Sequence, residues 1–273
     1  MKGRQIEKLI LAAQLAALSI FGMAACSSSR SGTSSQADSS SQTVPSAQHS
    51  ERTSEEIAEA RRKAEEAIQS PDGPQDGDSV PAETLPENGQ ATALKEETID
   101  GIYYKDGILI ANKKHGLPAD YAPGVDPTAS AQVSALIADM IAQGMDVSYD
   151  TSNFRSYDTQ AGLYNNYVAG YGQAEADTFS ARPGYSEHQT GLAFDLKHSS
   201  GALLTGPTEA QWLLDNSWKY GFIVRYQEGK EGITGYQAEP WHLRYIGDKA
   251  QAIAQSGLCL EEYLGVDGGD YAQ

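Results

Sequence analysis

A long stretch near the start of this 273-residue chain cannot build a hydrophobic core. Residues 27–97 are rich in Ser, Gln, Pro, Gly, Asp and Glu, and they contain no Phe, Tyr or Trp. A segment of this composition buries too little apolar surface to offset the entropy lost on ordering. We therefore expect a disordered tether over residues 26–97 and one folded domain over residues 98–273, which is long enough for a well-buried core.

The first residues have the pattern of an export signal. Three basic residues stand before or at the start of an apolar run that extends over residues 9–25 and ends in small residues. A retained membrane span is the alternative, but the run is short and is interrupted at Gln14 and Gly22. The pattern therefore predicts a signal peptide over residues 1–25.

The end of the apolar run resembles a bacterial lipoprotein box. Met23-Ala24-Ala25-Cys26 is followed directly by serines, and Cys26 would become the acylated first residue of the mature protein. Acyl chains would anchor the chain to a membrane, since each buried CH2 contributes about 0.8 kcal/mol. Cys259 is then the only other cysteine, and its apolar neighbours predict a small packing residue without a disulfide partner.

The charge of the chain excludes some partners. The formal net charge is -17 and the sequence pI is about 4.6. Phosphate backbones require a basic surface, so the chain is not expected to bind nucleic acid. The same charge argues against a general affinity for anionic lipid headgroups.

Two short motifs supply the groups of a catalytic metal site. Residues 186–195 read S-E-H-Q-T-G-L-A-F-D, and residues 239–242 read E-P-W-H. Together they provide two imidazoles, one carboxylate of buried appearance and a further glutamate. A catalytic zinc site uses three protein ligands, an open fourth position and a nearby carboxylate that moves protons. Taken singly, each residue has an ordinary structural explanation, such as a hydrogen-bonded His or an Asp that ends a strand.

The pattern S-x-H-x-x-G-x-A-x-D followed by E-P-W-H resembles the VanY-type D-alanyl-D-alanine carboxypeptidases, a group of zinc peptidases that cut peptidoglycan stem peptides. The resemblance covers roughly residues 99–265. It implies that His188, Asp195 and His242 hold Zn2+. It also implies the family's LAS-type zinc peptidase domain.

Local patterns agree with this ligand set. Gly191 marks a turn, and a strand over residues 192–196 would carry Asp195 back towards His188. Pro240 disfavours helix and makes its segment extended. In such a strand His242 and Arg244 would share one face, with Trp241 and its alternating neighbours on the other.

Glu239 is the residue that we expect to act as the general base. A fourth protein ligand would close the open position, whereas an adjacent carboxylate can accept a proton from a water whose pKa zinc lowers to about 7. The alternative is a structural ion pair with a nearby Arg or Lys.

Residues 154–160 resemble a substrate-binding segment of the same family, G-[YF]-R-S-x-x-x-Q, with Asn153 in place of the usual Gly. Arg binds a carboxylate through two parallel hydrogen bonds, as a carboxypeptidase requires. We expect Arg155 to bind the terminal carboxylate or the developing oxyanion, with Gln160 assisting. A surface Arg155 beside a helix start is the alternative.

Ser186 is expected to contact the substrate, as the resemblance implies. A serine nucleophile with His188 as base is disfavoured, because the G-x-S-x-G elbow is missing and the acidic residues would have no task. Three other histidines lack partner ligands at a telling spacing and are not assigned to metal: His49, His115 and His198. In the segment 218–226, most residues are expected to be core, with Arg225 pairing near the metal ligands.

The domain is expected to be α+β, with a small, mostly antiparallel sheet and flanking helices. Lys105-Asp106-Gly107 predicts a hairpin turn within residues 101–112. The remaining periodicities predict helices over 128–143, 159–171, 208–220 and 249–256, and strands over 147–154, 222–226 and 241–246.

These predictions describe a zinc D-alanyl-D-alanine carboxypeptidase that removes the last D-alanine from peptidoglycan stem peptides. The alternatives are an L,D-carboxypeptidase that acts on tetrapeptide stems and a non-catalytic peptide-binding lipoprotein. The chain is expected outside the cytoplasm, held to the bacterial cell membrane through lipidated Cys26 and facing the cell wall, with a monomeric domain.

Overall fold

The computed structural model describes residues 94–271. The predicted signal peptide, Cys26 and nearly all of the predicted tether therefore lie outside the described residues. Within residues 94–271, no helix combines the length and the apolar character needed to cross a membrane.

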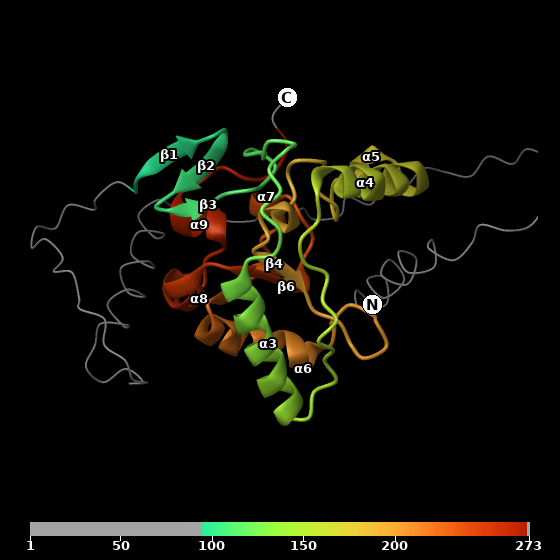
Figure 1. Cartoon of the computed structure of the whole chain (residues 1–273), viewed down its shortest axis with the longest axis vertical. Helices are drawn as coiled ribbons and strands as arrows, with labels where there is room; N and C mark the ends of the chain where they lie inside the picture. Colours follow the sequence, from blue (N-terminus) through green and yellow to red (C-terminus); the bar gives the residue numbers. More distant parts are fainter. Residues whose placement is uncertain (1–93, 272–273) are drawn as a thin grey trace, which may run out of the picture. The chain divides into compact units, whose positions relative to one another are not determined.

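A three-stranded antiparallel sheet opens the domain (Figure 1). Its strands are β1 (Glu96–Ile99), β2 (Ile102–Lys105) and β3 (Ile108–Leu109). The predicted turn at Asp106-Gly107 is confirmed, with φ values of 51° and 74°. Asp100-Gly101 forms a second turn of the same kind that we had not predicted, with φ values of 51° and 79°. β1 begins two residues before residue 98, where composition predicted the start of the folded domain.

A second antiparallel sheet, in the order β4-β6-β5, lies at the centre of the domain. Its strands are β4 (Ala193–Asp195), β5 (Phe222–Tyr226) and β6 (Glu239–Tyr245). The fold is thus α+β with small antiparallel sheets, as predicted, although the strands form two sheets.

Seven helices and three short 3-10 turns surround the sheets in the described part of the chain. α3 (Pro127–Ala142) starts at Asp126, whose carboxylate accepts a hydrogen bond from the amide of Ala129 at 2.8 Å. The other helices are α4 (Tyr157–Tyr171), α5 (Gln173–Ala176), α6 (Pro207–Asn216), α7 (Glu231–Thr234), α8 (Ala250–Ser256) and α9 (Leu260–Leu264). Single 3-10 turns are η1 (Glu187–Thr190), η2 (Ser217–Tyr220) and η3 (Gly247–Lys249).

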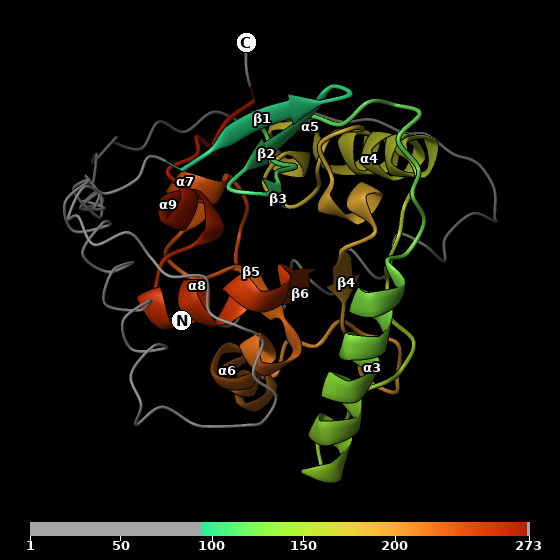
Figure 2. The same ribbon diagram turned by 60° about the vertical axis from the view of Figure 1, so that its left-hand side comes forward.

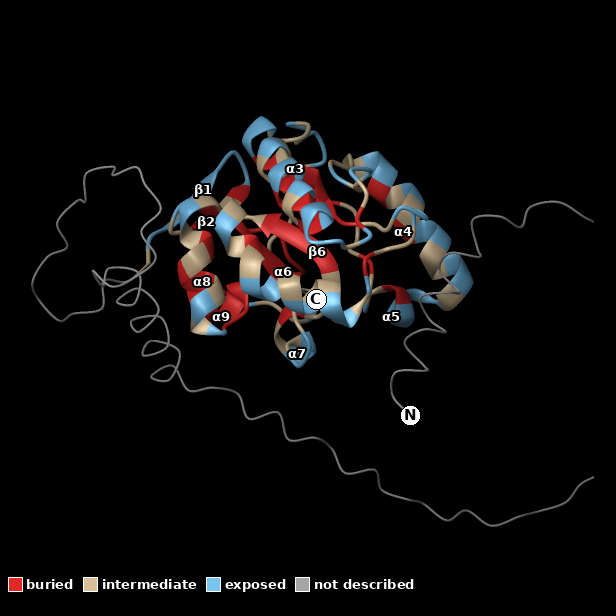
Figure 3. Ribbon diagram, turned by 90° about the horizontal axis from the view of Figure 1, so that it is seen from below, coloured by how far each residue is buried: buried red, intermediate tan, exposed pale blue. Residues whose placement is uncertain are grey.

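A buried hydrophobic cluster packs against one side of the β4-β6-β5 sheet. Figure 2 shows α3 and α6 on one side of this sheet, and α4 with the β1-β2-β3 sheet on the other. On the first side, Leu136 and Met140 of α3 share a buried cluster with Phe194 and Leu243. Figure 3 shows β6 buried along most of its length. Trp241 belongs to the same cluster, so its predicted place on the apolar face of the strand is confirmed.

Two of the predicted elements differ from the structure. The strand expected over 147–154 forms only an isolated bridge, between Ser152 and Asp195. Upstream of that bridge, the hydroxyl of Ser148 accepts a hydrogen bond from the backbone amide of Asp150. This local turn competes with the hydrogen bonds of a continuous strand. The helix expected over 208–220 divides into α6 and η2, and it begins at Pro207 with Gly206 as its N-cap.

Candidate metal centre

The turn η1 positions His188. The hydroxyl of Ser186 caps the turn by accepting a hydrogen bond from the backbone amide of His188 at 3.3 Å. The turn ends at Gly191, which has a left-handed φ of 73° and packs so closely that any Cβ would collide with the carbonyl oxygen of Gly124. Only glycine satisfies both conditions, so the chain reverses here and enters β4.

Pairing of β4 with β6 positions the other two predicted ligands. Asp195 and His242 are directly opposite each other in the antiparallel register. Directly opposed residues of such a pair place their side chains on the same face of the sheet. Oδ1 of Asp195 lies 3.4 Å from Nδ1 of His242, and Oδ2 lies 3.1 Å from Nε2 of His188.

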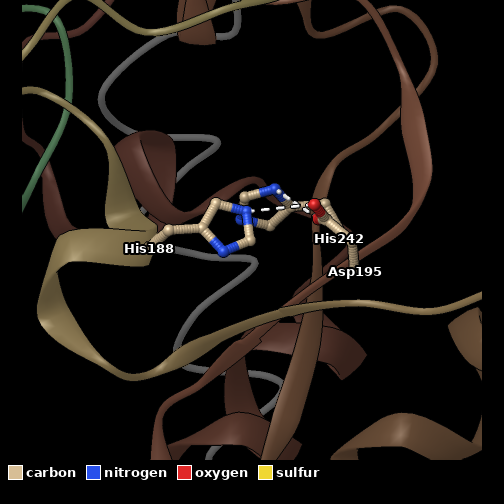
Figure 4. A group of neighbouring side chains, drawn as sticks. All are labelled: His188, Asp195 and His242. Carbon is tan, nitrogen blue, oxygen red and sulfur yellow. Dashed lines mark ion pairs between the residues drawn. The ribbon is translucent and has the colours of Figure 1, made fainter. Parts of the chain in front are cut away.

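The three predicted ligands form one cluster, and Figure 4 shows them converging from η1 and two neighbouring strands. One ligand atom of each residue lies within 4.8 Å of the others, and all three side chains are buried. Among the described residues this is the only group of three or more His, Cys, Asp or Glu side chains with such spacing.

The donor set fits a zinc ion. Two imidazole nitrogens and one carboxylate oxygen are ligands of catalytic zinc sites. Oδ1 of Asp195 is buried and has no hydrogen-bond partner in the structure, so it has a free lone pair towards the cluster. A buried carboxylate oxygen without a partner is costly unless a cation completes its coordination.

The electrostatics of the cluster also favour a cation. Burial alone would raise the pKa of Asp195, but His188, His242 and Arg155 lower that pKa to about 2. Burial would likewise lower the pKa of His242, yet hydrogen bonds to Glu187 and Glu239 and the charge of Asp195 raise it to about 10. The site therefore presents ionised carboxylates that stabilise positive charge at the position between the ligands.

Glu239 lies beside this cluster at the start of β6. Its Oε2 is 3.3 Å from Nδ1 of His242, and the residue is 8% exposed. Burial raises the pKa of Glu239 above its ordinary value, although His242 opposes that shift. A carboxylate with a raised pKa next to a metal site has the position and basicity of a proton acceptor.

Arg155 lies close to the cluster and is held by Gln160. Its amide donates to the carbonyl of His188 at 3.2 Å, and its Nη1 donates to Oε1 of Gln160 at 2.7 Å. Gln160 is buried, and its Nε2 donates to the carbonyl of Ala181 at 2.6 Å. Both ends of the Gln160 amide thus contact protein, and its oxygen holds the Arg155 guanidinium.

Ser186, His115 and His198 have partners of their own, and His49 lies outside the described residues. The hydroxyl oxygen of Ser186 caps η1, and its predicted contact with substrate stays a prediction. His115 stacks on Tyr103 with ring centroids 4.0 Å apart, and Nδ1 of His198 lies 2.8 Å from the carbonyl of Asp146. Neither histidine belongs to the ligand cluster.

Glu187 is a member of the site that was not expected from the sequence. This residue is fully buried next to His188, and its Oε2 lies 3.3 Å from Nε2 of His242. Burial alone would raise the pKa of Glu187, but Arg225 and Arg244 hold it well below its usual value. Arg225, within the otherwise apolar strand β5, was the available signal, because a buried Arg requires a buried counter-charge.

Comparison with known proteins places these residues in one family. A family model described as VanY, D-alanyl-D-alanine carboxypeptidase, matches residues 123–248, a range that includes every predicted ligand, Glu239 and Arg155. A D-alanyl-D-alanine carboxypeptidase of Enterococcus faecalis is 36% identical over 204 residues, covering 68% of this chain and 74% of that protein.

Solved structures agree with the fold and with the metal. The L,D-carboxypeptidase DacB from Streptococcus pneumoniae is 52% identical, with a TM-score of 0.64 over 66% of this chain and 100% of that one. A D,D-pentapeptidase VanY from a VanB-type vancomycin resistance cassette, solved with Zn(II), is 35% identical, with a TM-score of 0.50. That comparison covers 57% of this chain and 97% of the other.

Proposed function

Because this chain belongs to the VanY family of D-alanyl-D-alanine carboxypeptidases and is a zinc metallopeptidase, we propose that it is an L,D-carboxypeptidase that removes the terminal D-alanine from tetrapeptide stems of peptidoglycan. The observation that carries this specificity is the 52% identity to an L,D-carboxypeptidase whose solved chain is covered completely. The two relatives described above that are named for D,D or D-alanyl-D-alanine activity are 36% and 35% identical. D,D-carboxypeptidase activity, which the sequence analysis placed first, is the second candidate.

The residues of the buried site would divide into metal ligands and a proton acceptor. His188, Asp195 and His242 would hold zinc, and Oδ1 of Asp195 has no competing hydrogen bond. Zinc, when bound, supplies a Lewis acid that polarises the scissile carbonyl and acidifies water. Glu239 takes the proton of the attacking water and returns it to the leaving amine of D-alanine.

Arg155 would bind the negative charge of the substrate. Its guanidinium is half-buried, and its charge lowers the pKa values of Asp195 and Glu239, so it lies within electrostatic reach of the reacting groups. Gln160 fixes one nitrogen of that guanidinium and leaves the others for a carboxylate or for the developing oxyanion.

The test uses the purified, zinc-loaded protein with two substrates in separate reactions. One is a tetrapeptide stem that ends in a single D-alanine, and the other is a pentapeptide stem that ends in D-Ala-D-Ala. Products are identified by mass, and the Glu239→Gln variant serves as the inactive control. Loss of D-alanine from the tetrapeptide supports the proposal, whereas cleavage of the pentapeptide alone replaces it with D,D-carboxypeptidase activity.

We also propose that the mature chain is exported, lipidated at Cys26 and held outside the cell membrane facing the wall, with a monomeric domain. The basic start, the apolar run over residues 9–25 and the serines after Cys26 support this placement. Metabolic labelling with a fatty acid is expected to mark the wild-type chain and not Cys26→Ala. Equal labelling of the two chains would refute lipidation at this residue. Elution of the protein as a dimer in size-exclusion chromatography would refute the monomer.

A further inference from the structure

Glu187 is a fully buried carboxylate that none of the proposed roles above employs. Its side chain has 0% exposure and lies on η1 beside His188. An ionised carboxylate at this depth is costly unless charged partners surround it. Its partners therefore indicate what its position achieves.

The two oxygens of Glu187 have different partners. Oε1 accepts from Nε of Arg225 at 2.8 Å and from Nη1 of Arg244 at 2.9 Å. Both of these hydrogen bonds go to Oε1, whereas Oε2 lies 3.3 Å from Nε2 of His242. The arginines thus occupy one oxygen and leave the other directed at the imidazole.

The two arginines are themselves fixed by distant segments. Arg225 makes a bidentate pair with Glu261 of α9, at 2.8 and 2.5 Å. Nη2 of Arg244 donates to the carbonyl of Leu109 at 2.6 Å. Glu187, Glu261 and the two arginines form a network, called here the Glu187 network, of two negative and two positive charges whose side chains are at most 2% exposed.

Such a network is weak support for stability alone. Buried ion pairs often contribute no more than apolar residues of the same volume, so their presence calls for a further explanation. The explanation available here is geometric, because the network holds a carboxylate oxygen against the ring nitrogen of His242 that faces away from Asp195 and Glu239.

This contact determines which ring nitrogen is free. An ionised carboxylate can only accept a hydrogen bond, so Nε2 of His242 carries a proton and donates it to Glu187. A metal-ligating His is neutral, and in the neutral imidazole with Nε2 protonated the lone pair is on Nδ1, which lies 3.4 Å from Oδ1 of Asp195 and 3.3 Å from Oε2 of Glu239. The lone pair is therefore directed into the ligand cluster.

We propose that Glu187 is a positioning residue that fixes the tautomer and the ring orientation of His242 for zinc, and that the Glu187 network exists to direct one of its oxygens at that ring. The inference rests on the proposed role of His242 as a ligand. Partners of this kind, one step removed from a metal, typically change metal affinity about 10- to 100-fold.

The experiment compares two buried glutamates that share the same arginine. Glu187→Gln and Glu261→Gln each remove one negative charge from the Glu187 network, but only Glu187 contacts His242. The zinc dissociation constant of each full-length variant is measured by competition with a chromophoric chelator, and folding is checked by thermal melting. We expect zinc binding to weaken about 10- to 100-fold in Glu187→Gln and to stay within about threefold of wild type in Glu261→Gln.

Two results would overturn the proposal. One is a folded Glu187→Gln variant with wild-type zinc affinity. The other is equal weakening in both variants, which would mean that the network acts only through general stability. If Glu187→Gln does not fold, Glu187→Asp keeps the charge but shortens the side chain by one methylene. A folded Glu187→Asp variant with unchanged affinity is equally contrary to the proposal.

A spectroscopic measurement reads the tautomer directly. Long-range ¹H–¹⁵N correlation spectra of the zinc-loaded wild type should show His242 protonated at Nε2, and a proton at Nδ1 would overturn the proposal. None of these measurements uses a substrate, so they are independent of the choice between tetrapeptide and pentapeptide. Wild-type zinc affinity in His242→Ala would instead refute the ligand assignment, and the role of Glu187 with it.

Discussion

Nδ1 of His188 lies 2.7 Å from the backbone carbonyl oxygen of Asn153, 35 residues earlier in the chain. A carbonyl only accepts hydrogen bonds, so Nδ1 carries the proton and Nε2 is left free on the side of Asp195. The bridge between Ser152 and Asp195, with hydrogen bonds of 2.7 and 3.1 Å, places this carbonyl beside the imidazole. One of the two imidazoles is thus oriented by a backbone carbonyl, whereas Glu187 contacts the other.

The first prediction concerns Asn153, which stands at the Gly position of the segment G-[YF]-R-S-x-x-x-Q given above. The partner of His188 is the backbone carbonyl, and the φ of Asn153 is not in the left-handed region. We therefore expect Asn153→Gly and Asn153→Ala to keep zinc affinity and kcat/KM within about threefold of wild type, as for surface substitutions generally. Chelator competition and peptide hydrolysis measure the two quantities, and a tenfold loss in both variants would mean that the amide side chain has a role.

Removing the proposed base should separate chemistry from metal binding. Glu239→Gln keeps the shape of the side chain but cannot accept the proton, so we expect kcat to fall about 10²- to 10⁴-fold. Zinc content, measured by atomic absorption after gel filtration, should equal that of wild type, because Glu239 is not one of the three ligands. Full activity in this variant would transfer the role of base to another group.

The metal ligands could be predicted from sequence because the motif and the strand pattern give the same answer. His188 and Asp195 lie seven positions apart with a glycine turn between them, and His242 lies in an alternating strand. The structure pairs Asp195 with His242 across two strands. The predicted division of β6 into a face with His242 and Arg244 and a face with Trp241 is confirmed.

The Glu187 network could not be predicted in the same way. Its hydrogen-bonded pairs are 36 to 57 positions apart in the sequence, from Arg225–Glu261 to Glu187–Arg244, so no local spacing connects them. A local hydrogen bond also explains why no continuous strand forms over 147–154. The Ser148 hydroxyl accepts it from the amide of Asp150, in competition with strand pairing. Both errors concern hydrogen-bond partners, about which hydrophobic periodicity gives no information.

Zinc should stabilise the folded chain measurably. Oδ1 of Asp195 is buried without a hydrogen bond, and a ligand that binds only the folded state adds about 4 kcal/mol at a concentration of 1,000 times its Kd. We expect the Tm of the chelator-treated protein to rise by roughly 8–16 °C when zinc is restored at that concentration. Asp195→Asn should abolish the rise, whereas a wild-type response in this variant would exclude Asp195 as a ligand.

Arg155 and Gln160 should act as one unit. Arg155→Lys loses the planar fork that matches a carboxylate, so we expect kcat/KM to fall about 10- to 100-fold. Gln160→Leu removes the acceptor that holds Nη1 at 2.7 Å and should lower kcat/KM by a smaller factor. Because Gln160 acts through Arg155, the double variant should resemble Arg155→Lys alone. Multiplicative losses in the double variant would indicate two independent contacts with the substrate.

The last prediction concerns the pH dependence of stability, away from the metal site. Asp177 accepts from Nε and Nη2 of Arg182, at 3.1 and 2.8 Å, and from the hydroxyl of Tyr164 at 2.6 Å. Burial alone would raise the pKa of Asp177, but these partners lower it below its ordinary value of 3.8. A carboxylate with a depressed folded pKa stabilises the fold above about pH 3.8 and loses that contribution as the pH falls through the folded value.

The variant that tests this relation is Asp177→Asn, compared with wild type by urea unfolding at several pH values. We expect the variant to be less stable by about 1–3 kcal/mol at pH 7, and the difference to shrink below about pH 3.8. Asp150→Asn is the matched control, because Asp150 pairs with Lys197 at 3.3 Å while 78% exposed, and exposed pairs contribute little. A difference for Asp177→Asn that stays constant down to the acid limit would mean that its ionisation does not contribute to stability.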